Sequence, residues 1–301
     1  MITEKRSSST QAFVSVIIPV YNDTEALSKT LSELLNQSYP VRLYEVIVVD
    51  NGSDQDTFAA VKNYQNIIYA TENKVGSYAA RNKGIALSKG DILAFIDAGC
   101  IPAHGWLEQG VNSLNNVENA GLVGGRIKFS FVDQNKPTII ELYDSIMNLN
   151  TKKYIEEYNF SCTANLFTSR RVMEDVGLFN DSLKSGGDYE WGNRVFDRGY
   201  RLIYADKVVV THPARNSLKE LYNKALRIGG GLQGVNRISN RLESFPKRML
   251  PPLKRIRRII RDEQIATVWQ KMKLMLLIVF LKYAALLEEI KVSIRGNARR
   301  S

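Results

Sequence analysis

The chain has 301 residues, 44% of them hydrophobic, which is enough for a full core in one large domain or two of ordinary size. Its net charge of +10 lies in residues 241–301, which carry 15 Lys and Arg against 5 Asp and Glu. The two cysteines, Cys100 and Cys162, lie in no Cys-x-x-Cys pair and are too few for a disulfide framework. A disulfide-stapled domain is therefore excluded, and a globular protein of a reducing compartment, with both cysteines in its core, is favoured.

The N-terminal residues 1–11, MITEKRSSSTQ, are polar and lack the apolar stretch of a secretory signal. We therefore expect this segment to be disordered and the protein to stay in the cytoplasm. The folded part of the chain is expected to begin at residue 12.

Three short apolar runs in the first hundred residues predict buried strands. They are FVSVIIPV at 13–20, YEVIVVD at 44–50 and DILAFID at 91–97. Each run is nearly continuous and rich in β-branched residues, as in strands that are covered on both faces. Between the first two runs, leucine recurs at helical spacing at positions 27, 31, 34 and 35. This alternation predicts an α/β fold with a mostly parallel sheet flanked by helices.

Polar residues follow each of the three predicted strands, in the segments PVYND, DNGSD and DAGC. Asp50 and Asp97 end the second and third strands, at the edge where sheets of this kind receive nucleotide phosphates. The plainer alternative is that each Asp caps the following helix or begins a turn. No G-x-G-x-x-G follows the first strand and no G-x-x-x-x-G-K-[ST] occurs, which disfavours dinucleotide-dependent enzymes and P-loop ATPases.

Four segments, taken together, resemble the successive motifs of inverting glycosyltransferase family 2, which has the GT-A fold. They are VSVIIPVYND, VIVVDNGSD, AARNKGIALSKGDILAFIDAGCIP and GLFNDSLKSGGDYEWGNRVFDRGYRL. Each motif alone is weak, but their order and spacing from Val14 to His212 are specific. The resemblance implies a Rossmann-like GT-A catalytic domain over residues 12–240, with a nucleotide-binding half at 12–102 and an acceptor half at 103–240.

The resemblance also implies which residues hold the donor. The turn after the first strand and the end of the second strand would bind the nucleoside through Pro19, Tyr21, Asn22, Asp50 and Ser53. The segment AARNKG implies Arg81 as the cation beside the base or the diphosphate, with Asn82 supporting it. A guanidinium offers phosphate oxygens a rigid fork of donors, although Arg81 on a solvated helix face is the alternative.

The segment FIDAGCIP, residues 95–102, departs from the family's Asp-x-Asp motif, because Gly99 stands where the second acid is expected. In the family, this motif holds Mg²⁺ or Mn²⁺ at the sugar diphosphate. Mg²⁺ is often bound by one or two carboxylates with substrate phosphates and water, so we expect Asp97 to bind the donor and a divalent cation. His212 falls where family members often have a histidine, and it is either a second metal ligand or an ordinary surface histidine.

The reaction needs a base that takes the proton of the acceptor hydroxyl as this hydroxyl attacks the anomeric carbon. In the segment SGGDYEW, the resemblance implies Asp188 as the base and Glu190 as the reserve, with Gly187 in place of the family's usual Glu. The alternative is that both acids favour the start of a helix near Trp191. Arg194, one turn after Glu190, can pair with this acid and hold it away from the chemistry.

The segment FSCTANLFTSRRVMEDVGLF resembles the family's acceptor side, which implies that Asn165 and its neighbours line the acceptor pocket. Processive members of the family carry Gln-x-x-Arg-Trp after the base. In this chain Gln233 and Arg237 are mis-spaced for that motif and no Trp follows. Transfer of a single sugar is therefore favoured.

The sequence thus predicts an inverting transferase that moves one sugar from a nucleotide sugar, with UDP favoured, to a carbohydrate or lipid-linked acceptor hydroxyl. The biological setting would be cell-envelope or exopolysaccharide biosynthesis. The alternative, motivated by Gly99 and Gly187, is a catalytically weakened relative that binds nucleotide sugar or scaffolds a polysaccharide assembly. A nucleic-acid binder acting through the basic tail is disfavoured, because no RNA- or DNA-reading motif accompanies the charges.

Residues 241–301 predict a basic, amphipathic helical tail. Residues 246–261 are proline-broken and strongly basic, and residues 268–290 are apolar around much of a helix. The longest uncharged run, Leu274 to Leu281, has eight residues against the roughly 20 that span a bilayer. We expect the tail to lie on an anionic membrane surface, with the protein peripheral at the inner face of the membrane. The alternatives are a helix packed on the catalytic domain or on a dimer partner, and a tilted span.

Overall fold

The fold is known from a computed structural model that describes most of the chain. The described residues are 12–64, 66–235, 249–262, 265 and 267–295. The segment expected to be disordered, 1–11, lies outside the described residues, as do Arg237 and the tail residues 241–248, 263–264, 266 and 296–301. Both cysteines are buried and unpaired, which confirms the prediction that they belong to the core.

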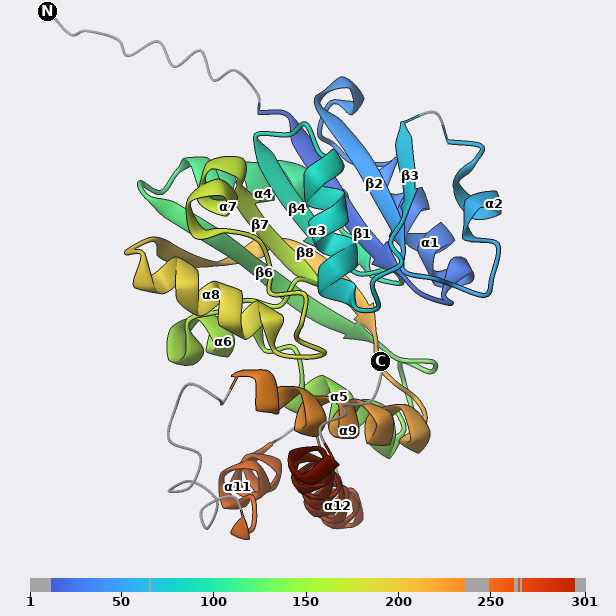
Figure 1. The fold of residues 1–301 in the computed structure, drawn as a ribbon. Helices are drawn as coiled ribbons and strands as arrows, with labels where there is room; N and C mark the ends of the chain where they lie inside the picture. The colour runs from blue at the N-terminus through green and yellow to red at the C-terminus, as the bar shows by residue number, and fades with distance from the viewer. Residues whose placement is uncertain (1–11, 65, 236–248, 263–264, 266, 296–301) are drawn as a thin grey trace, which may run out of the picture.

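Within the described residues, eight strands form one sheet in the order β3-β2-β1-β4-β7-β6-β8-β5 (Figure 1). Their bounds are β1 Val14–Val20, β2 Tyr44–Asp50, β3 Ile67–Thr71, β4 Ile92–Ile96, β5 Ile101–Pro102, β6 Ala120–Ser130, β7 Asn165–Ser169 and β8 Arg201–Pro213. The strands from β3 to β4 are parallel, and so are β6 and β8. β7 runs antiparallel to both of its neighbours, and β5 runs antiparallel to β8. The predicted α/β fold with a mostly parallel sheet is confirmed.

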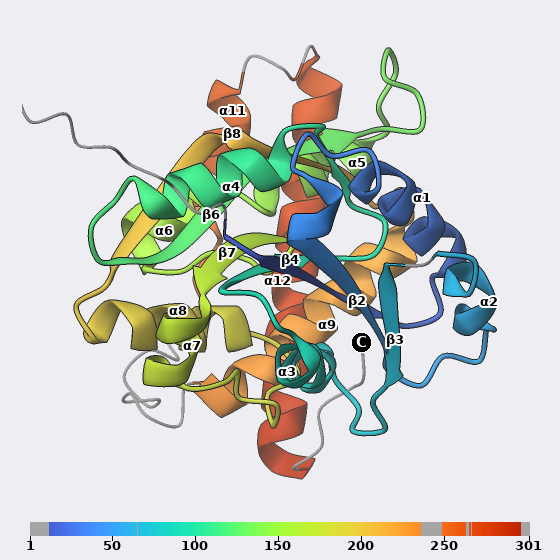
Figure 2. The same ribbon diagram turned by 90° about the horizontal axis from the view of Figure 1, so that it is seen from above.

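Helices cover both faces of this sheet (Figure 2). In the first half of the chain they are α1 Thr24–Leu34, η1 Val41–Leu43, α2 Thr57–Val61, α3 Ser77–Leu87 and α4 Trp106–Asn115. The second half has α5 Ile139–Met147, α6 Thr151–Tyr158, α7 Arg170–Val176, α8 Gly187–Asp197, α9 Leu218–Val235, α11 Leu253–Arg261 and α12 Val268–Arg295.

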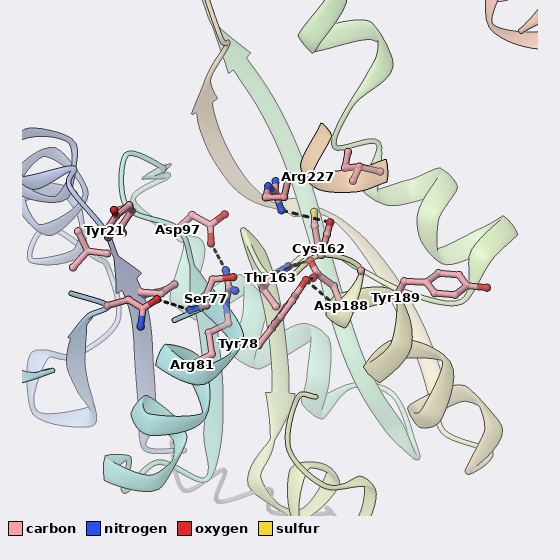
Figure 3. A pocket seen from close by; sticks show the side chains of 18 of the residues that line it. Tyr21, Ser77, Tyr78, Arg81, Asp97, Cys162, Thr163, Asp188, Tyr189 and Arg227 are labelled. Atoms are coloured by element: carbon pink, nitrogen blue, oxygen red, sulfur yellow. Dashed lines mark hydrogen bonds and ion pairs between the residues drawn. The ribbon is translucent and has the colours of Figure 1, made fainter. Parts of the chain in front are cut away.

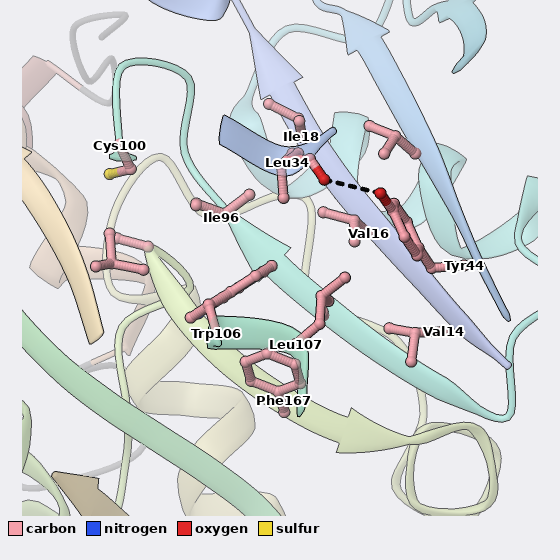
Figure 4. Packing of buried hydrophobic residues seen from close by; sticks show 14 of the residues in the cluster. Val14, Val16, Ile18, Leu34, Tyr44, Ile96, Cys100, Trp106, Leu107 and Phe167 are labelled. Atoms are coloured by element: carbon pink, nitrogen blue, oxygen red, sulfur yellow. Dashed lines mark hydrogen bonds between the residues drawn. The ribbon is translucent and has the colours of Figure 1, made fainter. Parts of the chain in front are cut away.

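Two apolar layers hold the helices to the sheet. On one face, Val16 and Ile18 of β1 pack with residues of α1 and α4, among them Trp106, whose ring lies 4.7 Å from that of Phe167 (Figure 4). On the other face, Ile17 packs with residues of α3, α7 and α8. Successive residues of a strand point to opposite faces, so a strand covered on both faces needs an apolar residue at almost every position. This explains the continuous apolar runs in the sequence.

The tail helices lie beneath the sheet, next to α5 and α9 (Figure 1). One face of α12 is buried through Leu274, Ile278 and Leu281, in a cluster with residues of α5 and α9. The backbones of α9 and α12 come close at Gly229, where a Cβ atom would lie 2.1 Å from the carbonyl oxygen of Ala285. Packing on the rest of the protein, expected as an alternative, is therefore observed for this face. None of the described helices is both long enough and apolar enough to cross a membrane.

Candidate active site

A cavity of about 470 Å³ opens at the carboxyl ends of β1 and β4 (Figure 3). The turn after β1, the residues after β4 and the first turns of α3 form one side. The other side is formed by the segment 160–163, by the start of α8 and by Arg227 and Ile228 of α9. Open α/β sheets bind their ligands outside the carboxyl ends of their strands, so this cavity is the candidate site.

The structure separates the predicted site residues into two sets. Those that line the cavity are Pro19, Tyr21, Arg81, Asp97 and Asp188. Those that do not line it are Asn22, Asp50, Ser53, Asn82, Asn165, Glu190 and His212. The separation has a physical cause, because polar atoms of the second set bind other groups of the protein.

Arg81 and Asp97 form an ion pair at the cavity, with 2.5 Å between Nη2 and Oδ1. Arg81 is 4% exposed on α3, whereas the side chain of Asp97, one residue beyond β4, is 38% exposed. A buried guanidinium is costly unless an acid pairs with it, so Asp97 stabilises Arg81 in this position. The Nε atom of Arg81 is buried without a hydrogen-bond partner among the described residues. The guanidinium lines the cavity, and its planar fork carries more N–H donors than the one that binds Asp97.

Asn22, Asp50 and Ser53 join the loops after β1 and β2. The backbone N–H of Asn22, a residue with a φ of 51°, donates to the hydroxyl of Ser53 at 2.8 Å. Asp50 accepts from the backbone N–H of Ser53 at 2.9 Å and from the hydroxyl of Tyr69 at 3.2 Å. Burial and the nearby Asp50 carboxylate raise the pKa of Tyr69 to about 12, so its hydroxyl remains a donor. Asn22, Asp50 and Ser53 do not line the cavity, but their bonds hold the loops that form its edge.

Asn51, which the sequence reasoning did not single out, lines the cavity instead of its neighbour Asp50. Its side-chain oxygen accepts from the backbone N–H of Gly76 at 2.7 Å, and its amide nitrogen donates to the carbonyls of Glu72 and Lys74. These three bonds hold the loop before α3 against the end of β2. Asn51 thereby fixes the entry to the helix that carries Arg81.

Asp188 lies in the first turn of α8 and faces the cavity (Figure 3). Its Oδ1 atom accepts a short hydrogen bond from the hydroxyl of Tyr78, and its Oδ2 atom accepts from the backbone N–H of Thr163 at 3.2 Å. A helix N-terminus stabilises a nearby negative charge. Both oxygens of the carboxylate are therefore held in a fixed direction at the wall of the cavity.

Glu190, the reserve base, does not line the cavity. Arg194 binds both of its carboxylate oxygens, at 2.7 and 3.1 Å, and also donates to the carbonyls of Val176 and Leu178. This is the i,i+4 pair that the spacing of Glu190 and Arg194 predicts. Because both oxygens are bound by one rigid guanidinium, Glu190 is held away from the cavity.

Asn165, expected in the acceptor pocket, lies in the core instead and is fully buried. Its oxygen accepts from the indole N–H of Trp106 at 2.9 Å, and its nitrogen donates to the carbonyls of Arg126 and Val208. A buried amide must satisfy its hydrogen bonds, and here it does so between strands β6, β7 and β8. The polarity of this residue serves the sheet and not the cavity.

Comparison with known proteins identifies the family of this site. The family model described as Glycosyl transferase family 2 matches residues 15–177. The chain belongs to glycosyl transferase family 2. Over 229 residues it is 44% identical to the glycosyltransferase AglE of Haloferax volcanii, with 74% of each chain covered. The predicted family is confirmed, and the protein is a glycosyltransferase.

A more distant relative of the glycosyltransferase is dolichyl N-acetyl-alpha-D-glucosaminyl phosphate 3-beta-D-2,3-diacetamido-2,3-dideoxy-beta-D-glucuronosyltransferase of Methanococcus voltae. It is 25% identical over 232 residues, which cover 72% of each chain.

Among solved structures, the mannosyltransferase PcManGT of Pyrobaculum calidifontis, in complex with GDP-Man and Mn²⁺, has a TM-score of 0.59 at 19% identity and covers 96% of this chain and 76% of its own. S. aureus TarS 1-349, in complex with UDP, has a TM-score of 0.54 at 16% identity and covers 96% of this chain and 93% of its own. At these identities the likeness concerns the fold alone, and the predicted GT-A fold is confirmed.

The glycosyltransferase departs from a two-carboxylate metal site for a local reason. Gly99 has a φ of 85°, its N–H donates to the hydroxyl of Thr30, and a Cβ atom there would lie 3.2 Å from that of Ala26. A residue other than glycine is strained in this conformation. Position 99 is therefore built for a tight turn after Asp97, and it is unsuited to a second acid.

Asp97 nevertheless fits a divalent cation. Arg81 binds its Oδ1 atom, and no described residue binds its Oδ2 atom. Burial and Arg215 lower the pKa of His212, so this half-buried imidazole, whose Nδ1 lies 2.7 Å from the carbonyl of Pro213, is neutral near pH 7. The described residues contain no group of three or more His, Cys, Asp or Glu side chains that could hold a metal. A bound ion would therefore need substrate oxygens and water as further ligands.

Besides Asn51, the sequence reasoning missed charged or polar residues of the transferase that line the cavity, among them Tyr78 and Arg227. Tyr78 lies one helical turn before Arg81 on α3, and this spacing was an available signal. Arg227 reaches the cavity from α9, where its Nη1 atom lies 3.5 Å from the hydroxyl of Ser185. It has no ion-pair partner within the described residues, and burial lowers the pKa of its guanidinium without removing the charge. No local motif marks Arg227, because only the path of α9 brings it to the site.

A buried ion cluster lies next to Arg227 along α9. Asp144 is fully buried and accepts from Arg215 at 3.1 Å, and the ammonium of Lys224 lies 3.5 Å from it. Burial opposes the charge of Asp144, but Lys224 and Arg215 together hold the pKa of this carboxyl below its ordinary value. Burial, helped by Arg215, lowers the pKa of Lys224 to about 7. None of these three residues lines the cavity, so within the described residues Arg227 is the cation that α9 brings to its wall.

Proposed function

We propose that the enzyme transfers one sugar from a nucleotide-sugar donor to an acceptor hydroxyl, with inversion at the anomeric carbon. The observation that carries this proposal is the division of charge around one cavity. Arg81, paired with Asp97, lies on one side, and the carboxylate of Asp188 lies on the other. Inverting transfer needs a site for the departing diphosphate on one face of the sugar and a base for the acceptor on the opposite face.

The proposed transfer is a single displacement at the anomeric carbon. The acceptor oxygen forms a bond to the anomeric carbon while its O–H bond breaks and the proton passes to the carboxylate of Asp188. The bond between the anomeric carbon and the diphosphate oxygen breaks, and the nucleoside diphosphate leaves with the electron pair. Arg81 stabilises the charge that develops on the leaving group, since preorganised electrostatics is usually the largest catalytic contribution. No covalent intermediate is required.

A divalent cation, Mg²⁺ or Mn²⁺, is proposed as the cofactor. Asp97 would hold it together with the donor's phosphate oxygens, and His212 is the candidate for a second ligand. When bound, the ion would neutralise charge on the diphosphate. The complex of PcManGT with GDP-Man and Mn²⁺ is consistent with such a cofactor.

For the donor nucleotide we propose UDP. The family resemblance favours it, and TarS, a neighbour in fold, is known in complex with UDP. Pro19, Tyr21 and Asn51 form the part of the cavity at the ends of β1 and β2, where the nucleoside would lie. Asn22, Asp50 and Ser53 would act indirectly, by holding the loops that carry these residues.

For the acceptor we propose a lipid-linked sugar at an anionic membrane. The name of the Methanococcus voltae relative describes transfer to a dolichyl-linked sugar phosphate. On α12 of this chain, the face away from the core has an exposed apolar stripe, between 44% and 71% exposed: Trp269, Met272, Leu276, Phe280 and Leu287. Exposed cations of α11 lie beside it: Lys254, Arg255, Arg257, Arg258 and Arg261. Apolar and basic groups side by side suit a peripheral protein at the inner face of an anionic membrane.

The function is tested by incubating the purified enzyme with a panel of UDP-, GDP- and dTDP-sugars and measuring both donor binding and released nucleoside diphosphate. The assay is run with Mg²⁺, with Mn²⁺ and with EDTA. Release from one donor that needs metal and is lost in Asp188→Asn supports the proposal. Binding without release in the presence of lipid-linked acceptors supports the weakened relative, and absence of donor binding contradicts a transferase of this kind.

The membrane surface is tested by sedimentation with vesicles of phosphatidylcholine, with or without phosphatidylglycerol. We expect binding only to the anionic vesicles, weakening as salt is added, and weaker binding of Trp269→Ser and Leu276→Ser. Val132→Ser is the matched control, because Val132 is 79% exposed in the loop before α5, away from the stripe. Equal binding of all variants would contradict the role of the stripe.

A further inference from the structure

Position 187 is a glycine because the ring of Tyr78, on α3, occupies the space beside its backbone. The backbone of Gly187 is not among those with positive φ, so its conformation does not require glycine. A Cβ atom at this position would lie between 2.6 and 2.8 Å from three ring carbons of Tyr78. The ring of Tyr78 therefore fills the space that a side chain at 187 would need, which explains why the acid expected there from the family resemblance is missing.

The hydroxyl of Tyr78 meets the first turn of α8 through three contacts. It donates to Oδ1 of Asp188, and it accepts from the backbone N–H groups of Gly187 at 2.9 Å and of Asp188 at 3.4 Å. Burial and the Asp188 carboxylate raise the pKa of Tyr78 well above its ordinary value, so the hydroxyl keeps its proton.

The position of Tyr78 is set by contacts outside α8. Its ring lies 6.0 Å from that of Phe179, and the guanidinium of Arg81 lies 5.7 Å from its centroid. On the same helix, Asn82 donates to the carbonyl of Phe179 at 2.8 Å and accepts from its N–H at 3.1 Å. Lys184 also donates to the carbonyl of Val75. These bonds fix α3 to the segment that leads into α8.

We propose that Tyr78 is the positioning residue for Asp188, and that Tyr78 and Gly187 form a matched pair in which the ring replaces the missing side chain. The proposal rests on the proposed function, in which Asp188 is the base. Tyr78 sets the direction of one carboxylate oxygen by a hydrogen bond, and the backbone of Thr163 sets the other. A base acts only when its oxygen is aimed at the proton that it takes.

The first test is Tyr78→Phe, which keeps the ring over Gly187 and removes the hydroxyl. With the donor found in the panel, we expect kcat to fall about 10- to 100-fold, the range for a lost hydrogen bond to a charged group, while KM for the donor changes little.

The matched control is Tyr200→Phe. The hydroxyl of Tyr200 also donates to an acid, Asp175 at 3.0 Å, but this pair lies outside the cavity. We expect kcat and the donor KM of this variant to equal those of the wild type. A wild-type kcat in Tyr78→Phe, or a change in donor KM alone, would overturn the positioning role.

The second test needs no substrate and so stands apart from the proposed function. Gly187→Ala is introduced into the wild type and into Tyr78→Ala, and the midpoints of thermal unfolding are compared. We expect Gly187→Ala to lower the midpoint in the wild type, where the new methyl group meets the ring, and to have little effect in Tyr78→Ala. An equal loss in both backgrounds would overturn the matched pair. If the wild type binds no nucleotide sugar, the proposed function fails while this test still decides the pairing.

Discussion

The two sides of the cavity are built differently. On the donor side, Arg81 and Asp97 are 16 residues apart in the chain and lie next to parallel strands whose backbone bonds set their positions. On the other side, Asp188 is held by Tyr78, 110 residues away, and by Thr163, 25 residues away. The cation of the donor side is therefore positioned by a local strand–helix unit. The direction of the carboxylate depends on side-chain contacts between distant segments.

The largest effect should come from Asp188. We expect Asp188→Asn to lower kcat by about 10²- to 10⁴-fold, the contribution of a general base, with donor binding retained. Glu190→Gln is the matched variant on the same helix, and it should leave kcat nearly unchanged because Arg194 holds that acid. Steady-state kinetics with isothermal titration of UDP separates the two. A large loss of kcat in Glu190→Gln would show that the wrong acid has been chosen.

Removal of the Asp97 carboxylate should lower catalytic efficiency and abolish metal binding on the side of the cavity that holds Arg81. We expect Asp97→Ala to lower kcat/KM about 10²- to 10³-fold, a size typical of one lost electrostatic contact at the reacting centre. The variant should also lose its response to added Mn²⁺, whereas the wild type should lose activity in EDTA and regain it with metal. Metal titrations of both proteins check this. Full Mn²⁺ stimulation of Asp97→Ala would contradict Asp97 as the ligand.

Arg227 brings a further cation to the cavity, from α9. We expect Arg227→Met to weaken UDP binding about tenfold, since it removes a charged contact to the anionic ligand. Arg201→Met is the control, with an exposed arginine at the far end of β8. Fluorescence titration with UDP measures both. If UDP binds Arg227→Met as tightly as the wild type, Arg227 does not contact the donor.

The stability of the protein should depend on pH through the buried cluster next to Arg227. The pKa of Lys224 is about 7 in the folded protein and about 10.4 in an unfolded chain, so the unfolded state binds more protons between these values. The free energy of unfolding should therefore fall as the pH is lowered from about 10 to 7, by at most about 1.4 kcal/mol per pH unit from this group.

Urea unfolding at several pH values compares the wild type with Lys224→Met. The variant should show a flatter dependence on pH between 7 and 10. The same slope in both proteins would mean that Lys224 titrates in the folded state as it does in solution.

The strands and the donor side could be predicted from the sequence because each depends on neighbours along the chain. A strand covered on both faces gives a continuous apolar run, and an Asp at its end lies at the binding edge of the sheet. Asp97 is predicted in this way, whereas Arg81 and Asp188 are predicted from the family resemblance, and all three line the cavity. Gly99 and Gly187 were noticed as departures, but the contacts that require them, with Ala26 and Tyr78, were not visible.

The residues that the sequence misplaced are those whose partners come from several strands or from a distant helix. Asn165 was expected at the acceptor, yet its amide bonds Trp106 and two backbone carbonyls in the sheet. Arg227 was missed because it depends on where α9 runs. For the tail, the sequence predicts a membrane surface and leaves packing on the protein as an alternative. One face of α12 is buried against α5 and α9, and the sequence does not show which helices cover it.

Gly229 limits how far α9 and α12 can move relative to each other. Because the backbone of Ala285 leaves no space for a side chain at 229, α9 and α12 touch without an intervening layer and have little freedom to slide. Arg227 lies two residues before this contact, half a turn along α9. A tilt of α12 would therefore be transmitted directly to α9, the helix that carries Arg227.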